Sequence, residues 1–356
     1  MKKEMFVLAA LATLAACSKT EVTPVASNVN SEITFNVAPR TKALSQNQTD
    51  FDHNNVFVSY AYYLGHGKTW AANSSEAQMY IDGSTISYNG NLWKNETTSY
   101  YWPKDGGSLT FFAYSYNKKD MTIGDNSGFA CVWAPGKDGQ YQGGINGHFD
   151  VATNKNVDFL VADIAADKTE NKNSYAHTGV PTLFRHKLSM VNVAANLAED
   201  YANKKFILNS VKFTNLCHYA TYSQIPEKMT PGGNDFLSDQ VYAENVGFEV
   251  KSGRLIAVPA EIKGGARVED GQYIYIPQEF NDNSYIVITY TVETVVGNNV
   301  VKEECTKTVK VKDVFPKWEM GYRYTFNLTF SLNEIHWDPA VENWIDDEAG
   351  NITIDR

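Results

Sequence analysis

The stretch Tyr322–Leu332 (YRYTFNLTFSL) carries the clearest structural signal in this sequence of 356 residues. Every second residue from Tyr322 to Leu332 is aromatic or aliphatic, and every residue between them is polar. Side chains of a β-strand point alternately to opposite faces, so this period of two predicts a long strand with one buried face and one solvated face.

Similar strand patterns recur along the chain and are rich in aromatic and β-branched residues. They lie at 56–63, 99–102, 109–116, 157–162, 187–194, 206–216, 273–276 and 285–292. Thr308–Lys312 alternates valine with lysine, which is typical of an edge strand because lysine discourages stray pairing. Only Leu197–Lys205 and Ser74–Met79 resemble helices, and both are short. The pattern predicts an all-β chain built as one or two sandwiches.

The length favours two domains. Without residues 1–16 about 340 residues remain, and single cores stop growing near ~250–300 residues. Ala176–Pro181 follows a polar loop and precedes a new strand pattern. We therefore expect an N-terminal domain over 41–180 and a C-terminal domain over 181–356.

The N-terminal residues indicate export. Lys2 and Lys3 precede an apolar run, Met5–Ala16, that is too short to span a bilayer. The run ends in Leu14-Ala15-Ala16-Cys17, which resembles the lipobox of bacterial lipoproteins. The resemblance implies a signal peptide over 1–16 and acylation of Cys17 with chains such as palmitate, which hold a protein on a membrane when two or more are present. The alternative is an ordinary secretory signal with a chance cysteine.

Charge and motifs argue against several classes of function. The net charge is −10 and no cluster of Lys and Arg occurs, whereas nucleic-acid-binding proteins carry a basic footprint. No sequence motif of a metalloprotease, serine hydrolase or nucleotide-binding protein is present. We therefore expect no catalytic residue, no metal and no cofactor. A glycosidase remains a third hypothesis, because distant carboxylates can meet in the fold.

Three cysteines follow Cys17, namely Cys131, Cys217 and Cys305. An odd number outside the cytoplasm leaves at least one unpaired or paired between chains. We interpret them as small buried hydrophobic residues, and their disulfide state stays open.

The first strand of the mature chain follows a polar tether, so that tether and strand occupy residues 17–40. Ile33, Phe35 and Val37 alternate with polar or small residues. Pro39, Arg40 and Lys42 then begin a polar stretch that is typical of an exposed, protease-sensitive loop. Cleavage after Arg40, or after the competing site Lys42, would release the strand together with the lipid.

The chain resembles the fimbrillin family of type V pilins from Bacteroidetes. Beyond the lipobox and Arg40, the similar stretches are 100–103 (YYWP), 109–114 (LTFFAY), 157–162 (VDFLVA), 183–189 (LFRHKLS) and 318–324 with Trp337 and Trp344. Each motif is weak alone, but together they follow the family order over nearly the whole chain.

The resemblance implies two transthyretin-like antiparallel β-sandwich domains in tandem and export to the outer membrane and cell surface by the lipoprotein machinery. It also implies that an arginine-specific protease removes the first strand, and that a strand of another pilin subunit fills the groove. The product would be a fimbrium, a homo- or hetero-polymer, with a host glycan or protein as receptor. Stalk, anchor and tip subunits share this outline, so the position in the filament stays open.

The donor strand is expected near the other end of the chain. Ile352 and Ile354 alternate with polar residues in Asn351–Asp355. The alternatives are a frayed tail or a final strand within the same molecule. Trp337, Val341 and Trp344 lie upstream and belong either to this arm or to the packing of the last domain. A further hypothesis for the whole chain is a monomeric surface lipoprotein that binds glycans, because tyrosine and tryptophan are abundant.

Overall fold

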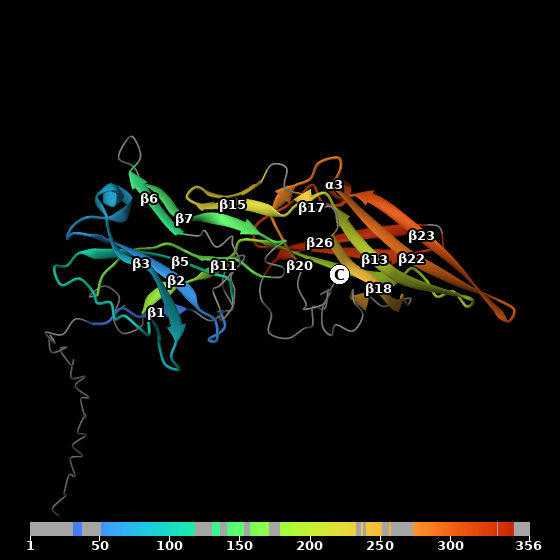
Figure 1. Ribbon diagram of the computed structural model, residues 1–356, viewed down its shortest axis with the longest axis horizontal. Coiled ribbons are helices and arrows are strands. Elements are labelled where there is room, and N and C mark those ends of the chain that lie inside the picture. The colour runs from blue at the N-terminus through green and yellow to red at the C-terminus, as the bar shows by residue number, and fades with distance from the viewer. Residues whose placement is uncertain are drawn as a thin grey trace, which may run out of the picture. The chain divides into compact units, whose positions relative to one another are not determined.

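Strands make up almost all of the regular structure in this chain. The computed structural model describes residues 31–37, 51–117, 130–135, 141–152, 157–170, 179–232, 236–237, 240–250, 256–257, 273–332 and 334–344, which belong to one unit, Ser31–Arg356. Within these ranges the helices are limited to α1 (Trp70–Asn73), a 3₁₀ turn (Ser74–Glu76) and α3 (Val311–Val314). The all-β prediction is confirmed (Figure 1).

The first sheet has nine strands and contains the residues that matter most for function. Its order is β10-β1-β4-β3-β2-β5-β8-β11, with β9 beside β5. In that order the path runs through Val180–Thr182, Phe35–Val37, Trp93–Lys94, Gln78–Tyr88, Phe57–Leu64, Ser108–Ser115, Leu160–Ala162 and Phe184–His186, and β9 is Ala165–Lys168.

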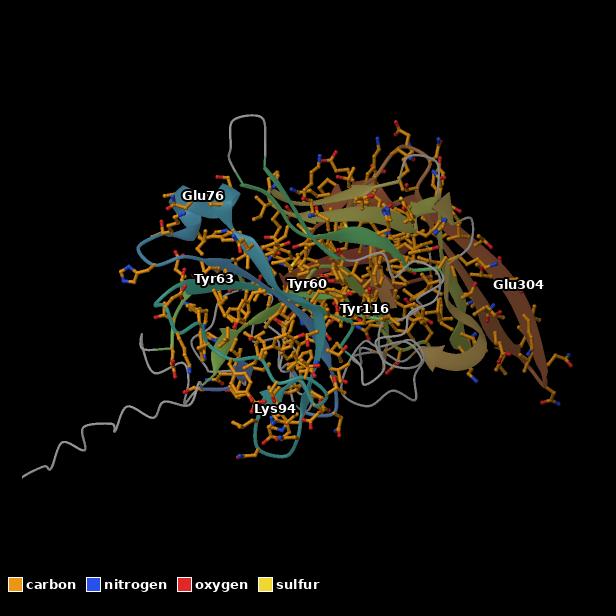
Figure 2. All side chains as sticks on the ribbon, turned by 60° about the vertical axis from the view of Figure 1, so that its left-hand side comes forward. Tyr60, Tyr63, Glu76, Lys94, Tyr116 and Glu304 are labelled. Carbon is orange, nitrogen blue, oxygen red and sulfur yellow. The ribbon has the colours of Figure 1, made fainter. Side chains whose placement is uncertain are left out.

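The central strands of this sheet, β2 and β5, have buried side chains on both faces. On one face Phe57 (β2) and Phe111 (β5) pack with Phe35 of β1, because the sheet curls back on itself. On the other face Tyr60 and Tyr116 lie inside a second cluster (Figure 2). Four strands cover that face, in the order β16 (Glu227–Pro231), β15 (Tyr219–Gln224), β7 (Tyr141–Asp150) and β6 (Ala130–Pro135).

Two further sheets enclose a third cluster of buried apolar side chains. One has the order β19-β12-β25-β26, with β20 beside β12, and spans Ile256–Ala257, Ser189–Leu197, Tyr322–Phe330, Ile335–Asn343 and Tyr273–Tyr275. The other has the order β18-β13-β22-β23 and spans Gln240–Val250, Lys204–Thr214, Tyr285–Val296 and Asn299–Lys310. Their facing side chains form one apolar core, as in a β-sandwich. The pairs β14 (Leu216–Cys217) with β17 (Phe236–Leu237) and β21 (Gln278–Glu279) with β24 (Lys317–Trp318) complete the strands.

The alternating stretch Tyr322–Leu332 contains β25, and the apolar face of this strand is buried as predicted, from Tyr324 to Phe330. The opposite face is less exposed than its polarity suggests. Arg323 is buried and donates to Glu342 at 3.0 Å, and Asn327 is buried and donates to the carbonyl of Asp338 at 2.9 Å. Leu332 lies beyond the strand and is exposed.

Other predictions have mixed outcomes. The edge strand predicted at Thr308–Lys312 is confirmed in part. Thr308–Lys310 belong to β23, the last strand of its sheet, on which Glu304 points outward (Figure 2), whereas Val311 and Lys312 begin α3. The helix predicted at Leu197–Lys205 is wrong, since β12 ends at Leu197 and β13 begins at Lys204 after a turn. Residues 99–102 contribute an isolated bridge at Tyr101 and no named strand.

Several pairings connect residues on the two sides of position 180. β11 pairs with β8, and β15 pairs with β7, although β11 and β15 come after residue 180 and their partners before it. The tandem arrangement of two transthyretin-like domains stays a prediction.

Candidate functional site

The first strand is held between neighbours on both sides. β1 pairs parallel with β10 over three register positions, Phe35 with Val180 through Val37 with Thr182, and antiparallel with β4 where Phe35 meets Trp93. The N–H of Ile33 donates to the carbonyl of Tyr100 at 2.7 Å, and the N–H of Val180 donates to that of Thr34 at 2.7 Å. The segment is therefore an interior strand of the sheet.

The three apolar side chains predicted for this strand all point into the core. Ile33, Phe35 and Val37 are 3%, 5% and 7% exposed. The Phe35 ring meets Phe57 and Phe111 edge to face, with ring centroids 5.4 and 5.8 Å apart. Burial of such side chains contributes about 1.5–3 kcal/mol each, or roughly 5–9 kcal/mol for the three before the entropy of ordering the strand is subtracted. Apolar burial is therefore a main contribution to holding this strand in place.

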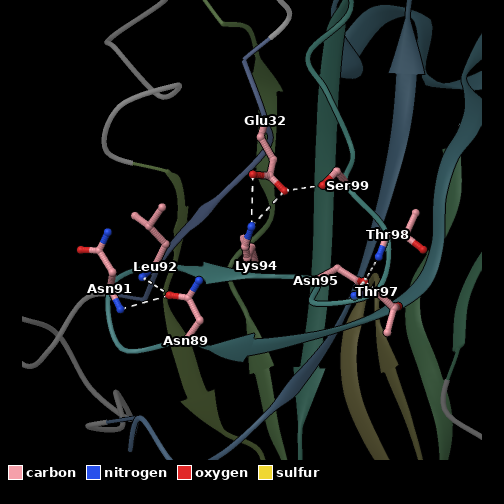
Figure 3. A network of polar contacts seen from close by, with 9 residues as sticks. All are labelled: Glu32, Asn89, Asn91, Leu92, Lys94, Asn95, Thr97, Thr98 and Ser99. Carbon is pink, nitrogen blue, oxygen red and sulfur yellow. Dashed lines mark hydrogen bonds and ion pairs between the residues drawn. The ribbon is translucent and has the colours of Figure 1, made fainter.

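A polar contact marks the start of this segment. The Lys94 ammonium lies 3.4 Å from both carboxylate oxygens of Glu32, and the Ser99 hydroxyl donates to Glu32 at 2.7 Å (Figure 3). The side chains of Lys94 and Glu32 are 26% and 28% exposed, so this ion pair is partly shielded from solvent. This end of the site therefore favours a negatively charged side chain.

β10 is followed directly in the chain by β11, whose position is fixed by contacts that do not involve β1. Arg185 on β11 donates to both carboxylate oxygens of Asp163, at 2.6 and 2.7 Å. This hydrogen bonding raises the pKa of the Arg185 guanidinium. These contacts hold β11 without involving β1.

Gly179 allows the close approach of β10 to β1. Its φ is +83°, which favours glycine, and a Cβ there would lie 2.6 Å from the carbonyl carbon of Phe35. The backbone of the strand, and not only a flexible side chain, would have to move.

Gly179→Ala is therefore expected to lower the free energy of unfolding by about 1–3 kcal/mol and to loosen β1 without any cut. The matched control is Gly90→Ala, where φ is +94° but nothing lies within 4 Å of the added Cβ. Hydrogen exchange at Ile33–Val37 should rise for Gly179→Ala alone. Equal exchange in the two variants would contradict this role of Gly179.

Cys17, Arg40 and Lys42 lie outside the described residues, as do Ile352 and Ile354. Arg40 follows Val37 by three positions, so a cut there separates β1 from the rest of the chain. The structure thus places Ile33 and the strand β1, Phe35–Val37, which is shorter than the predicted strand, while the lipidation, cleavage and donor positions stay predictions.

The residues before the expected donor strand pack on the body of the protein. β26 pairs with β25 along its whole length, and Trp337 on it is partly buried. Trp344 is fully buried, and its ring stacks on His186 with centroids 4.0 Å apart. His186 in turn contacts Asp158 at 2.7 Å. Of the two alternatives, packing on the body is correct for Trp337 and Trp344, whereas Val341 belongs to the paired strand β26 but is 51% exposed.

Sequence reasoning missed Glu32, Lys94 and Gly179. Glu32 and Lys94 carry no local signal, because their pairing joins residues that are 62 positions apart. Gly179 lies in Ala176–Pro181, the stretch interpreted as a domain boundary. Its proximity to β1 depends on the fold.

Other types of site have little support in the described residues. No group of three or more His, Cys, Asp or Glu there could hold a metal ion. No tryptophan side chain that the structure describes is exposed, so these rings serve packing. Cys217 is buried and its thiol donates to the carbonyl of Tyr219, while Cys305 is partly exposed. Within the described ranges no helix is long and apolar enough to cross a membrane.

Comparisons with known proteins indicate the family and the fold of this chain. The family described as fimbrillin-like matches residues 41–344. The fimbrium subunit Fim1C of Phocaeicola vulgatus is 23% identical, over 99% of each sequence. A solved fimbrial protein from Bacteroides vulgatus ATCC 8482 has a TM-score of 0.62 at 19% identity, covering 88% of this chain and 99% of that chain. The last likeness establishes a shared fold.

Proposed function

This chain belongs to the fimbrillin-like family, and from that premise we propose that it is a structural and adhesive subunit of a fimbrium and catalyses no reaction. The observation that carries the proposal is the seating of β1. A short strand near the start of the described chain is buried in the core, and Arg40 follows it in a polar stretch. The family match begins at Thr41, directly after Arg40, and ends at Trp344. The two segments outside the match are the ones that exchange would use.

The proposal includes export as a lipoprotein. The export machinery removes residues 1–16 and acylates Cys17, and the lipid carries the chain to the outer membrane and the cell surface. The segment between Cys17 and β1 then spans the distance from the membrane to the folded body.

Assembly follows from the position of β1. An arginine-specific protease cuts after Arg40, or a related protease after Lys42, and β1 departs with the lipid. Its departure exposes the backbone groups of Val180 and Tyr100 that it satisfied, together with the apolar surface beneath Phe35. A strand of another pilin subunit restores both by β-augmentation, in which main-chain hydrogen bonds supply affinity and alternate side chains enter the core. Before the cut, β1 protects this edge from premature pairing.

The donor is the segment with Ile352 and Ile354. It follows Trp344, whose burial and stacking on His186 fix it to its own subunit. A donor anchored in this way transmits tension from one subunit to the next. The finished filament presents the subunit to a host glycan or protein receptor.

The mature N-terminus tests this function. Fimbriae sheared from cells and analysed by mass spectrometry should contain this chain beginning at Thr41, or at Ala43 if Lys42 is the cut site. Copies that all begin with lipidated Cys17 would indicate a permanent surface lipoprotein and would contradict the proposal.

A further inference from the structure

We propose that Asn351–Asp355 of a second copy of this chain enters the β1 site in the direction opposite to that of β1, with Asp355 in the place of Glu32 and Ile352 in the place of Phe35. The inference rests on the proposed function, because β1 must first leave. Beyond the donor segment already proposed, it gives that segment's register and polarity in the β1 site and a second copy of this chain as its source, none of which follows from strand exchange alone.

The first argument is the sequence of the two segments. Residues 32–36 read E-I-T-F-N, and residues 355 to 351, taken backward, read D-I-T-I-N. An acidic residue, an isoleucine, a threonine, a large apolar residue and an asparagine follow one another in both. The forward order N-I-T-I-D also aligns the central Ile-Thr-Ile, but it exchanges the acidic and amide ends. The two directions therefore differ in which residue meets each end of the site.

The second argument is the charge at the Glu32 end. Lys94 and Ser99 both contact the Glu32 carboxylate, and Lys94 is only 26% exposed (Figure 3). In the reversed direction the Asp355 carboxylate replaces that of Glu32. In the forward direction Asn351 meets the lysine, and Asp355 falls at the exposed position of Asn36, where β1 itself has a neutral side chain. Charge complementarity favours the reversed direction.

The third argument is the backbone. β1 runs parallel to β10 over three register pairs, whereas the antiparallel pairs of this segment are one with β4, Phe35 with Trp93, and one bridge, Glu32 with Tyr101. Parallel pairing is slightly less stable per residue than antiparallel pairing. A reversed strand turns the longest of these pairings antiparallel. Alternate side chains still point into the core, because alternation does not depend on the direction of the strand.

The apolar positions provide the test. In the reversed register Ile352 occupies the place of Phe35, between Phe57 and Phe111, and leaves part of the ring's volume unfilled. Ile354 takes the place of Ile33 and matches it. Ile352→Phe should therefore fit better than wild type, whereas Ile354→Phe should be too large. In the forward register the two effects exchange places.

The experiment uses the full chain, purified uncut, with thermal unfolding of each variant measured first. After cleavage by an arginine-specific protease, dissociation of the oligomers is followed by dilution and size-exclusion chromatography. We expect Ile352→Phe to slow dissociation about tenfold and Ile354→Phe to speed it by a similar factor. Lys94→Glu should also speed dissociation, and Asp355→Lys should rescue it, whereas Asn351→Lys should not.

Slower dissociation with Ile354→Phe, together with rescue of Lys94→Glu by Asn351→Lys, would overturn the reversed direction while leaving strand exchange intact. Equal dissociation of all variants would overturn the choice of Asn351–Asp355 as occupant. If the wild-type chain loses β1 and still forms no oligomer, the proposed function fails and this inference fails with it. The Ile352 and Ile354 variants decide the direction even if Lys94→Glu does not fold.

Discussion

Replacing Phe35 with alanine is expected to lower the free energy of unfolding of the uncut chain by about 3–5 kcal/mol. Phe35 is 5% exposed, and its ring contacts Phe57 and Phe111 from two neighbouring strands. Removal of the ring leaves a cavity whose walls belong to paired strands and relax only in part. Chemical denaturation of the purified, uncut protein measures the change.

The matched control is Asn36→Ala, one residue further along the same strand. Asn36 is exposed, so this change should stay within about 0.5 kcal/mol of wild type. A loss for Phe35→Ala no larger than that of Asn36→Ala would mean that β1 is not part of the cooperative core. The description of the site would then be wrong.

A double replacement of Arg40 and Lys42 by alanine should reduce oligomer formation by about a thousandfold, although the fold itself is unaffected. As long as the chain is uncut, β1 competes for its site as part of the same molecule, at an effective concentration in the millimolar range. A neighbouring subunit at micromolar concentration cannot displace it. Size-exclusion chromatography after protease treatment compares the oligomer yield of the variant with that of wild type.

Lys68→Ala is a suitable control, because Lys68 is a surface lysine paired with Glu76 and lies far along the chain from the cut. Its oligomer yield should equal that of wild type. If the double variant assembled as well as the control, cleavage between β1 and the body would not be the trigger.

The sequence predicted those parts of the fold in which the residue pattern within a single strand indicates its buried face or its place at a sheet edge. Tyr322–Phe330 shows its apolar face directly, and the valine–lysine alternation that begins at Thr308 indicates the edge strand β23, although that strand ends at Lys310. Ile33, Phe35 and Val37 were predicted as a strand, and they are buried as one. In these segments the local pattern and the tertiary environment agree.

Where the local pattern is broken, prediction failed. β3 spans Gln78–Tyr88, but its pairing with β2 shifts register twice, and Gly83 has a φ of +66°. These irregularities interrupt the alternation, and the beginning of the strand was interpreted as part of a helix. Arg323 was placed in solvent by its charge alone, yet it is buried beside Met190, with Glu342 as its partner.

The partners of β1 could not have been found from sequence. Val180 lies 145 positions after Phe35, and Lys94 lies 62 positions after Glu32. Only the fold brings these residues together, and no local period marks them. The strand itself was predictable, but the site that it occupies was not.

The central claim, that β1 leaves and a neighbour takes its place, is tested most directly by native mass spectrometry of wild-type oligomers formed after protease treatment. We expect that subunits whose β1 site is filled by a neighbour's strand begin at Thr41 or Ala43, and that no peptide containing Ile33, Phe35 and Val37 remains bound to them. Oligomers whose subunits retain that peptide, or a fully cut chain that stays monomeric, would contradict it.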